Sequence, residues 1–228
     1  MNNRCECGED HQECDSVEQL EFKDLITEQD LIKPKKYDFD KMKLATQLFL
    51  DAVGHPDWRK DDNTFETPTR VAKMWEVLLG GYDIDNDQHS KTFPATSDNA
   101  VFISNVPFFS MCSHHLMPFS GVINLAYIPD GKVVGLSKLP RIARTHCKRL
   151  QLQENLTKDI ATDIERLLNP KGVAVQIKAT HSCMSLRGVR SHGAITTTTH
   201  LSGLFKTDLA ARTEFLETIK ADPNVFRY

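Results

Sequence analysis

The chain has 228 residues, of which 40% are hydrophobic and 26% are charged, and its formal net charge at pH 7 is -3. This length is enough for one substantial core with an accessory segment, and the slightly acidic balance argues against a general nucleic-acid binder, which would carry a basic excess. Because the polar start predicts no signal peptide and no apolar run is long enough to cross a membrane, we expect a soluble, cytoplasmic protein with no nucleic-acid or membrane partner.

Residues 1–36 are polar and acidic and have only weak periodicity, which predicts a mobile tail with one short helix around residues 17–25. The tail contains three cysteines and His11. Their spacing fits no zinc-binding module, so we expect the tail to be solvated and free of metal.

A helical segment is predicted over residues 37–95. Apolar residues recur at helical spacing over 38–53, and the Gly-His-Pro sequence that follows ends this helix. Thr67 as N-cap and Pro68 in the first turn predict the start of a second helix, which two glycines end. Residues 82–100 are predicted to form a loop.

Residues 96–228 are predicted to form an α+β domain. Alternating and β-branched residues predict strands, and apolar residues at helical spacing predict helices. The expected order is strands over 101–103, 121–128 and 132–136, helices over 137–150 and 152–168, and strands over 173–179 and 196–199. Strands on either side of a helix pair are typical of the α+β class.

A metal site is predicted from short fragments of the sequence. Cys112 and His115 can reach one ion from a single tight turn, and Cys183 arrives from a distant strand. Zinc takes Cys sulfur and His nitrogen in a tetrahedral shell, and three protein ligands leave one position open for water, as in catalytic sites. His114 and His181 are spare histidines beside these ligands. The alternative is that these cysteines and histidines are buried separately and never meet.

A phosphate site is predicted where a strand gives way to the helix over 137–150. Ser137 is placed to cap this helix, whose free N–H groups and dipole attract phosphate. Lys138 and Arg141 lie three residues apart on one helical face. Further cations come from Arg70, Lys73, Arg187 and Arg190. The alternative is that these cations belong to solvated surfaces.

The segment Gln151-Leu152-Gln153-Glu154 has two interpretations. A buried Glu154 carboxylate flanked by amides would accept two hydrogen bonds from the N–H edge of a purine. Glu154 would equally suit the first turn of a helix, where acidic side chains are common. The residues alone favour the helix start.

Together these fragments resemble the GTP cyclohydrolase I family over residues 66–216. The shared motifs are Cys-x-His-His, Tyr-Ile-Pro, Gly-Leu-Ser-Lys, Gln-x-Gln-Glu, His-x-Cys, Arg-Gly-Val and a threonine-rich strand followed by Gly-Leu-Phe. The resemblance implies conversion of GTP and water to 7,8-dihydroneopterin triphosphate and formate, with Zn²⁺ as cofactor.

The resemblance assigns roles to the residues of the metal site. It implies that Cys112, His115 and Cys183 bind the zinc. His114 and His181 match the acid–base histidines of the family.

The resemblance also implies a substrate site. Glu154, with Gln153, matches the position that recognises guanine, and Ser137 is a further candidate for proton transfer. The residues that match triphosphate contacts are Ser137, Lys138, Arg141 and Arg187, with Arg70 and Lys73 reaching in from a neighbouring subunit.

The fold that the resemblance implies is the tunnelling fold, an antiparallel four-stranded sheet backed by two helices. Residues 96–228 would form this catalytic domain. The subunits would close edge to edge into a pentameric barrel, and two barrels would stack as a decamer. Closing the sheet across subunits removes exposed strand edges.

One residue departs from the family pattern, because Ser113 replaces the usual glutamate beside a zinc ligand. This leaves a non-catalytic, zinc-bearing binding module on the same fold as one alternative, which a turnover assay with GTP tests. A nitrile reductase with a Cys nucleophile and a nicotinamide cofactor is a second alternative. The His114-His115 pair and Cys183 argue against the reductase.

Overall fold

The computed structural model describes residues 37–55 and 57–220. The short helix expected around residues 17–25 and the cysteines of the tail lie outside these ranges. The division between a helical segment over 37–95 and a domain over 96–228 stays a prediction. None of the helices in the described ranges combines the length and the hydrophobicity that a membrane span requires.

Two helices precede the sheet, as the spacing of their apolar residues predicted. They are α1 (Phe39–Ala52) and α2 (Thr67–Leu79), and they pack against each other. The Asp38 carboxylate caps α1 by accepting from a backbone N–H of the first turn at 3.0 Å. The N-cap position of α2 is Glu66, without a side-chain cap, so the expected cap at Thr67 was wrong by one residue.

Residues 82–100 contain regular structure where a loop was predicted. Two short 3₁₀ helices, η3 (Gly80–Tyr82) and η4 (Asn86–His89), are followed by β1 (Thr92–Pro94). β1 pairs antiparallel with β4 (Lys132–Val134). The loop prediction failed because three residues are too few to show the alternation that identifies a strand.

The central feature of the described residues is a five-stranded sheet in the order β5-β2-β3-β6-β7. Four of its strands run antiparallel, namely β2 (Val101–Cys112), β3 (Pro118–Ile128), β6 (Gly172–His181) and β7 (Thr196–Leu201). The fifth, β5 (Leu150–Gln151), pairs parallel with the last two residues of β2. The α+β class and the antiparallel four-stranded sheet are confirmed, with β5 as an addition at the edge.

Strand β2 is much longer than the strand predicted over 101–103. Asn105 has a φ of 59°, and the pairing with β3 shifts between Ile103 and Val106, which marks a bulge. Pro107 follows directly. Asparagine and proline normally interrupt strands, so the sequence pattern stops at the bulge although the strand continues through it.

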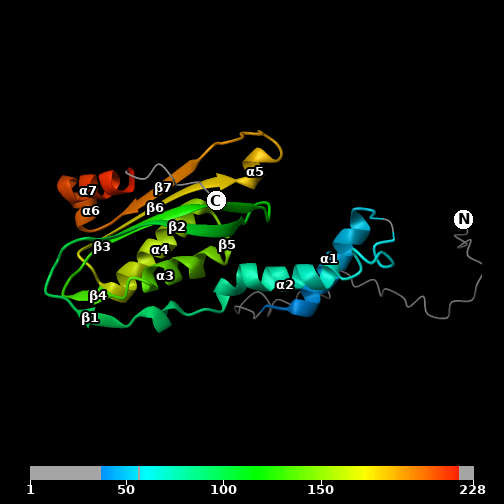
Figure 1. The fold of residues 1–228 in the computed structure, drawn as a ribbon, viewed down its shortest axis with the longest axis horizontal. Helices are drawn as coiled ribbons and strands as arrows, with labels where there is room; N and C mark the ends of the chain where they lie inside the picture. The colour runs from blue at the N-terminus through cyan, green and yellow to red at the C-terminus, as the bar shows by residue number, and fades with distance from the viewer. Residues whose placement is uncertain (1–36, 56, 221–228) are drawn as a thin grey trace, which may run out of the picture. The chain divides into compact units, whose positions relative to one another are not determined.

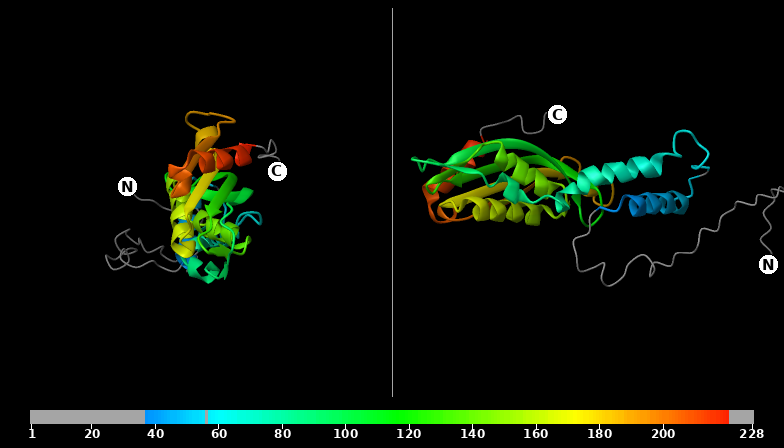
Figure 2. Two further views of the ribbon diagram at one scale, coloured as in Figure 1. Left: turned by 90° about the vertical axis from the view of Figure 1, so that its left-hand side faces the viewer. Right: turned by 90° about the horizontal axis from the view of Figure 1, so that it is seen from below.

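Two helices cover one face of this sheet, as Figures 1 and 2 show: α3 (Lys138–Cys147) and α4 (Gln153–Leu168). They contact each other, and α3 also contacts β2 while α4 contacts β6 and β7. The helix predicted over 137–150 ends at Cys147, because Leu150 instead pairs with Met111 in the sheet.

The other face of the sheet carries α6 (Leu204–Thr207) and α7 (Leu209–Lys220). Alternation along β6 separates the two cores, since Val175 belongs to the core under α3 and α4 whereas Ala174 packs with Phe205 of α6. A sheet buried on both faces leaves its strand ends as the place where polar side chains can gather.

Candidate functional site

The predicted metal ligands come from two neighbouring strand ends. β2 ends at Cys112, and the chain turns back into β3 at Pro118. β3 pairs with β6 in a register that places Phe119 opposite His181. The turn between β2 and β3 therefore lies beside the end of β6, where Cys183 follows in the short helix α5 (Ser182–Ser185).

The turn after Cys112 is tight, as the spacing of its ligands predicted. The Cys112 carbonyl accepts from the N–H groups of His115 and Leu116 at 3.4 and 2.9 Å. Leu116 has a φ of 52°, and the Cys112 N–H donates to the carbonyl of Met117 at 2.9 Å. This turn directs the side chains of both histidines back toward the thiol.

The Cys112 thiol and the imidazoles of His114 and His115 form one cluster, with ligand atoms all within 4.8 Å of one another. Cys112 Sγ lies 4.0 Å from His115 Nδ1. Two such ligands in a tetrahedral zinc site are about 3.6 Å apart, given the usual Zn–S and Zn–N bond lengths. The spacing of this one pair is therefore close to that of two zinc ligands.

Cys183, in α5 directly after β6, lies beside Cys112 but outside this group of mutually close ligand atoms. Burial raises the pKa of its thiol, and the neighbouring Cys112 thiol raises that pKa further. Partial desolvation lowers the pKa of His115, although its side chain is exposed, and the nearby Arg187 and His114 lower it further. A neutral imidazole is the form that binds a metal, and a bound cation favours the thiolate form of both cysteines. The structure thus groups Cys112 with His114 and His115 and places Cys183 next to Cys112, and the assignment of Cys112, His115 and Cys183 as the ligand set stays a prediction.

His181 lies at the end of β6, on the same side as the cluster. Its ring stacks on Phe119 with centroids 4.7 Å apart and an interplanar angle of 3°. Its Nε2 lies 2.7 Å from Oε1 of Gln153. Burial lowers the pKa of His181, and the negative charge of Glu154 opposes this shift. The stacking on Phe119 and the contact with Gln153 together fix the position of the His181 ring.

The predicted phosphate residues begin α3. Ser137 occupies the position before the helix but makes no side-chain cap, so the expected capping bond is absent and the exposed hydroxyl stays available. Lys138 and Arg141 follow on α3, and neither has an acidic partner among the described residues. Burial lowers the pKa of His89, and the charges of these two cations lower it further. Both cations therefore lie near η4.

The other predicted cations lie in different places. Arg187 follows α5, and its charge acts on both His115 and Cys183, which puts it beside the metal cluster. Arg70 lies on α2, where its guanidinium binds Glu66 at 2.8 Å. Lys73 is exposed on the same helix. Within this chain, Arg70 and Lys73 make no recorded contact with the residues of α3 or α5.

The two residues of the predicted guanine site differ in exposure. Gln153 is 2% exposed, and its amide is used within the chain. Glu154 follows in the first turn of α4 and is exposed, so the buried carboxylate that the sequence suggested is open to solvent in this chain. Its negative charge nevertheless reaches His181.

Ser113 lies in the metal-binding turn with its side chain exposed. Its N–H donates to the carbonyl of Gln151 at 3.1 Å, which ties this turn to β5. The serine at position 113, where the family has a glutamate, therefore still allows the backbone of the turn to bond to β5.

Three further residues help to build the site, and the sequence did not single them out. Phe119 stacks on His181, and the hydroxyls of Thr157 and Thr198 lie 2.6 Å apart behind Gln153. Thr198 belongs to the threonine-rich strand, but the sequence pattern could not show which threonine of that strand faces α4.

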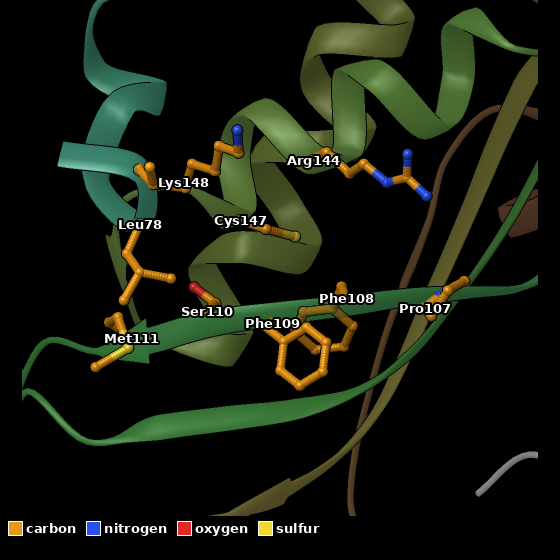
Figure 3. Close-up of a pocket in the computed structure, with 10 residues that line it drawn as sticks. Leu78, Pro107, Phe108, Phe109, Ser110, Met111, Arg144, Cys147 and Lys148 are labelled. Atoms are coloured by element: carbon orange, nitrogen blue, oxygen red, sulfur yellow. The ribbon is translucent and has the colours of Figure 1, made fainter. Parts of the chain in front are cut away.

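A separate hollow of about 350 Å³ lies between α2, β2 and α3 (Figure 3). It is lined largely by apolar side chains, among them Leu78, Phe108 and Phe109. Cys147 also lines it, and burial raises the pKa of this thiol to about 12, which leaves it unreactive. None of the predicted site residues lines this hollow.

Comparison with known proteins places most of the chain in one family. The family model described as GTP cyclohydrolase I matches residues 42–220. GTP cyclohydrolase 1 of Chlorobaculum tepidum is 48% identical over 177 residues, covering 77% of this chain and 78% of that protein. GTP cyclohydrolase 1 of Geobacillus sp. (strain WCH70) is 44% identical over 185 residues, covering 80% of this chain and 97% of that protein. A solved structure of the archaeosine synthase QueF-Like in the apo form matches 47% of this chain at 21% identity, with a TM-score of 0.39.

Proposed function

Because this chain belongs to the GTP cyclohydrolase I family, we propose that it hydrolyses and rearranges GTP to 7,8-dihydroneopterin triphosphate and releases formate. The observation that carries the proposal is the group formed by Cys112, His114 and His115, with Cys183 next to Cys112. Thiols and imidazoles from separate strands converge at the end of a sheet whose faces are otherwise closed.

Cys112, His115 and Cys183 would hold a zinc ion, and their sulfur and nitrogen atoms suit that metal. When bound, zinc supplies a water of lowered pKa as a nucleophile near neutral pH. The protein itself supplies proton transfer, since His181 or His114 can protonate N7 of guanine and so make C8 electrophilic. The exposed hydroxyl of Ser137 is a candidate for proton transfers during the ribose rearrangement.

The substrate would be held at both of its ends. Glu154 would accept hydrogen bonds from the N–H edge of guanine, and Lys138, Arg141 and Arg187 would bind the triphosphate. These cations lack acidic partners among the described residues, which leaves them available. Binding at the remote phosphates helps to orient the reacting ring.

An oligomer would complete this site. Glu154 is exposed in the single chain, and Arg70 and Lys73 lie on α2 without contact to the other cations. Among the described residues β7 forms one edge of the sheet, and the outer backbone groups of an edge strand favour pairing with another chain. We propose closure into a barrel of five subunits and stacking into a decamer, in which Arg70 and Lys73 reach a neighbouring site.

The test is incubation with GTP, with formate and pterin fluorescence measured before and after treatment with a chelator. Turnover that stops with the chelator and returns with Zn²⁺ is expected. Cys112→Ser and Cys183→Ser should abolish both zinc binding and turnover, whereas Cys147→Ala, a matched change at a buried cysteine away from the cluster, should keep both. Full activity in metal-free protein would refute the zinc site, and zinc binding without turnover would favour the binding-module alternative.

A further inference from the structure

The side chain of Gln153 is fixed in one orientation by its neighbours. Its Nε2 lies 3.2 Å from the Ile177 carbonyl, 3.0 Å from the Thr196 carbonyl and 3.1 Å from Thr198 Oγ1. Backbone carbonyls only accept hydrogen bonds, so the amide nitrogen must face them. The amide oxygen therefore faces His181, and a flipped amide would set an acceptor against two carbonyls.

The hydroxyls of Thr157 and Thr198 determine which atom donates and which accepts in each hydrogen bond around Gln153. Thr157 Oγ1 lies 2.7 Å from the Gln153 carbonyl and 2.6 Å from Thr198 Oγ1. Both hydroxyl protons find an acceptor among the described residues only if Thr157 donates to that carbonyl and Thr198 donates to Thr157. Thr198 then has a lone pair free to accept from Gln153 Nε2. The network is fully satisfied, as buried polar groups need to be.

The direction of this network determines the protonation of His181. Because Gln153 Oε1 can only accept, the His181 nitrogen 2.7 Å away, Nε2, must carry a proton. The stacked ring of Phe119 fixes the plane of the imidazole. Nδ1 has no hydrogen-bond partner among the residues that the structure describes. Nδ1 is therefore the ring nitrogen that is available to accept a proton and to donate it during the reaction.

We propose that Gln153 is a positioning residue for His181 and does not read the purine. Its amide holds the imidazole with one proton on Nε2, so that Nδ1 is the atom that takes up a second proton from water and delivers it to the substrate. Only an amide serves this purpose, because one group must accept from the histidine while its other atom donates to β6 and β7. This inference rests on the proposed function, since it assigns His181 its proton-transfer atom within that reaction.

Steady-state kinetics of the zinc-loaded protein with GTP separate the two roles. Gln153→Met keeps the volume but removes the acceptor and the donors. We expect kcat to fall at least about 10-fold, part of the 10²–10⁴ that a positioned acid–base group contributes, with KM for GTP changed less than about 3-fold. A raised KM with unchanged kcat would mean that Gln153 reads the purine. Unchanged kcat and KM would also overturn the proposal.

Gln176→Met is the matched control. Gln176 is 6% exposed and its Nε2 donates to Thr199 Oγ1 at 3.3 Å, so this variant also loses a buried amide that joins β6 to β7. Gln176 does not contact His181 in the part of the chain that the structure describes, and kcat should stay within about 3-fold of the parent. An equal loss of kcat in both variants would indicate a general structural effect and contradict the proposal.

A spectroscopic measurement tests the protonation directly. Solid-state ¹⁵N NMR of histidine-labelled protein resolves protonated and unprotonated ring nitrogens, and a His181→Gln sample identifies the signals of His181. The parent should show a protonated Nε2 and an unprotonated Nδ1, and Gln153→Met should lose this preference. The opposite tautomer in the parent would refute the inference.

Thr198→Val provides a second variant if Gln153→Met does not fold. It keeps the side-chain volume but removes the hydroxyl that accepts from Gln153, so a smaller fall in kcat with unchanged KM is expected. If the parent protein does not turn over GTP, the proposed function fails, whereas the NMR measurement still decides whether Gln153 fixes the tautomer of His181.

Discussion

Replacing Asp163 with asparagine should strongly destabilise the protein although Asp163 lies outside the candidate site. Its carboxylate, 12% exposed, accepts from Asn86 Nδ2 at 2.6 Å, from His146 Nε2 at 3.0 Å and from Arg166 Nη2 at 2.7 Å. These bonds join η4, α3 and α4. Arg166 also pairs with Asp87 on η4, and Arg149 approaches the other nitrogen of His146.

The magnitude follows from the donors that would be left without a partner. Asn86 is 4% exposed and His146 is 7% exposed, so neither can turn to water. A buried donor without a partner costs about 1–3 kcal/mol, and an asparagine at position 163 keeps one acceptor while setting its own NH₂ against the remaining donors. We expect a loss of about 2–4 kcal/mol, or a fall in Tm of roughly 5–15 °C for a domain of this size.

The same residue gives the stability an acid dependence. Burial alone would raise the pKa of Asp163, but the hydrogen bonds from His146, Asn86 and Arg166 outweigh it and hold the pKa well below its usual range. The unfolded chain therefore binds the proton first, at a pKa of about 3.9. The stabilisation is fully present above that pH and is lost as pH falls toward the folded pKa.

Thermal unfolding at fixed protomer concentration, followed from pH 7 to pH 3, measures both effects. The Tm difference between the parent and Asp163→Asn should be large at pH 7 and should shrink below about pH 4. Asp87→Asn is the control, because the Asp87–Arg166 pair is exposed on both sides and such pairs contribute about 0–1 kcal/mol. A Tm loss no larger than that of the control, or a difference that does not change with pH, would refute the reasoning.

Three further predictions concern the candidate site. Glu154→Ala should weaken or abolish productive GTP binding, measured as kcat/KM, because the guanine edge loses its charged acceptor; equal processing of ATP and GTP by the parent would contradict this role. Lys138→Ala or Arg141→Ala should reduce turnover of GTP far more than that of guanosine, and a parent that processes both equally has no triphosphate site. Ser113→Glu should keep zinc, measured by metal analysis, and should keep or raise turnover. The reason is that loss of a residue that contacts a metal ligand typically costs about 10–100-fold in affinity or activity. Loss of zinc in this variant would show that the turn differs from that of the family.

Periodicity predicted the elements that are long and regular. α1 and α4 follow the expected spacing closely, because each presents one apolar stripe to a neighbour over three or more turns. β6 was found for the matching reason, since its alternating residues fill the two cores. The failures are short or irregular. β1 has three residues, and β2 passes through a bulge at Asn105 that looks like a strand end.

The metal site shows how far spacing alone can reach. Cys112 and His115 share one turn, so their proximity follows from local geometry. The approach of Cys183 depends instead on the register of β3 and β6, which pairs Phe119 with His181. A one-residue slip would reverse the faces of β6, and no local pattern fixes that register. The resemblance to a family supplied what the spacing could not.

The contacts made by the segment from β5 to the start of α4 could not be predicted from the sequence. Gln151 pairs with Cys112 at the end of β2, accepts from the Ser113 N–H and donates to the His146 carbonyl of α3. Gln153, two residues later, holds His181. One short stretch therefore fixes the metal-binding turn, the end of α3 and the imidazole relative to one another. The side-chain amide of Gln153 accepts from His181 and donates to β6 and β7, a double role that a carboxylate cannot fill, whereas Gln151 accepts through its backbone carbonyl. The Gln-x-Gln spacing is thus explained by contacts within the chain, and only the exposed Glu154 remains free to meet a ligand.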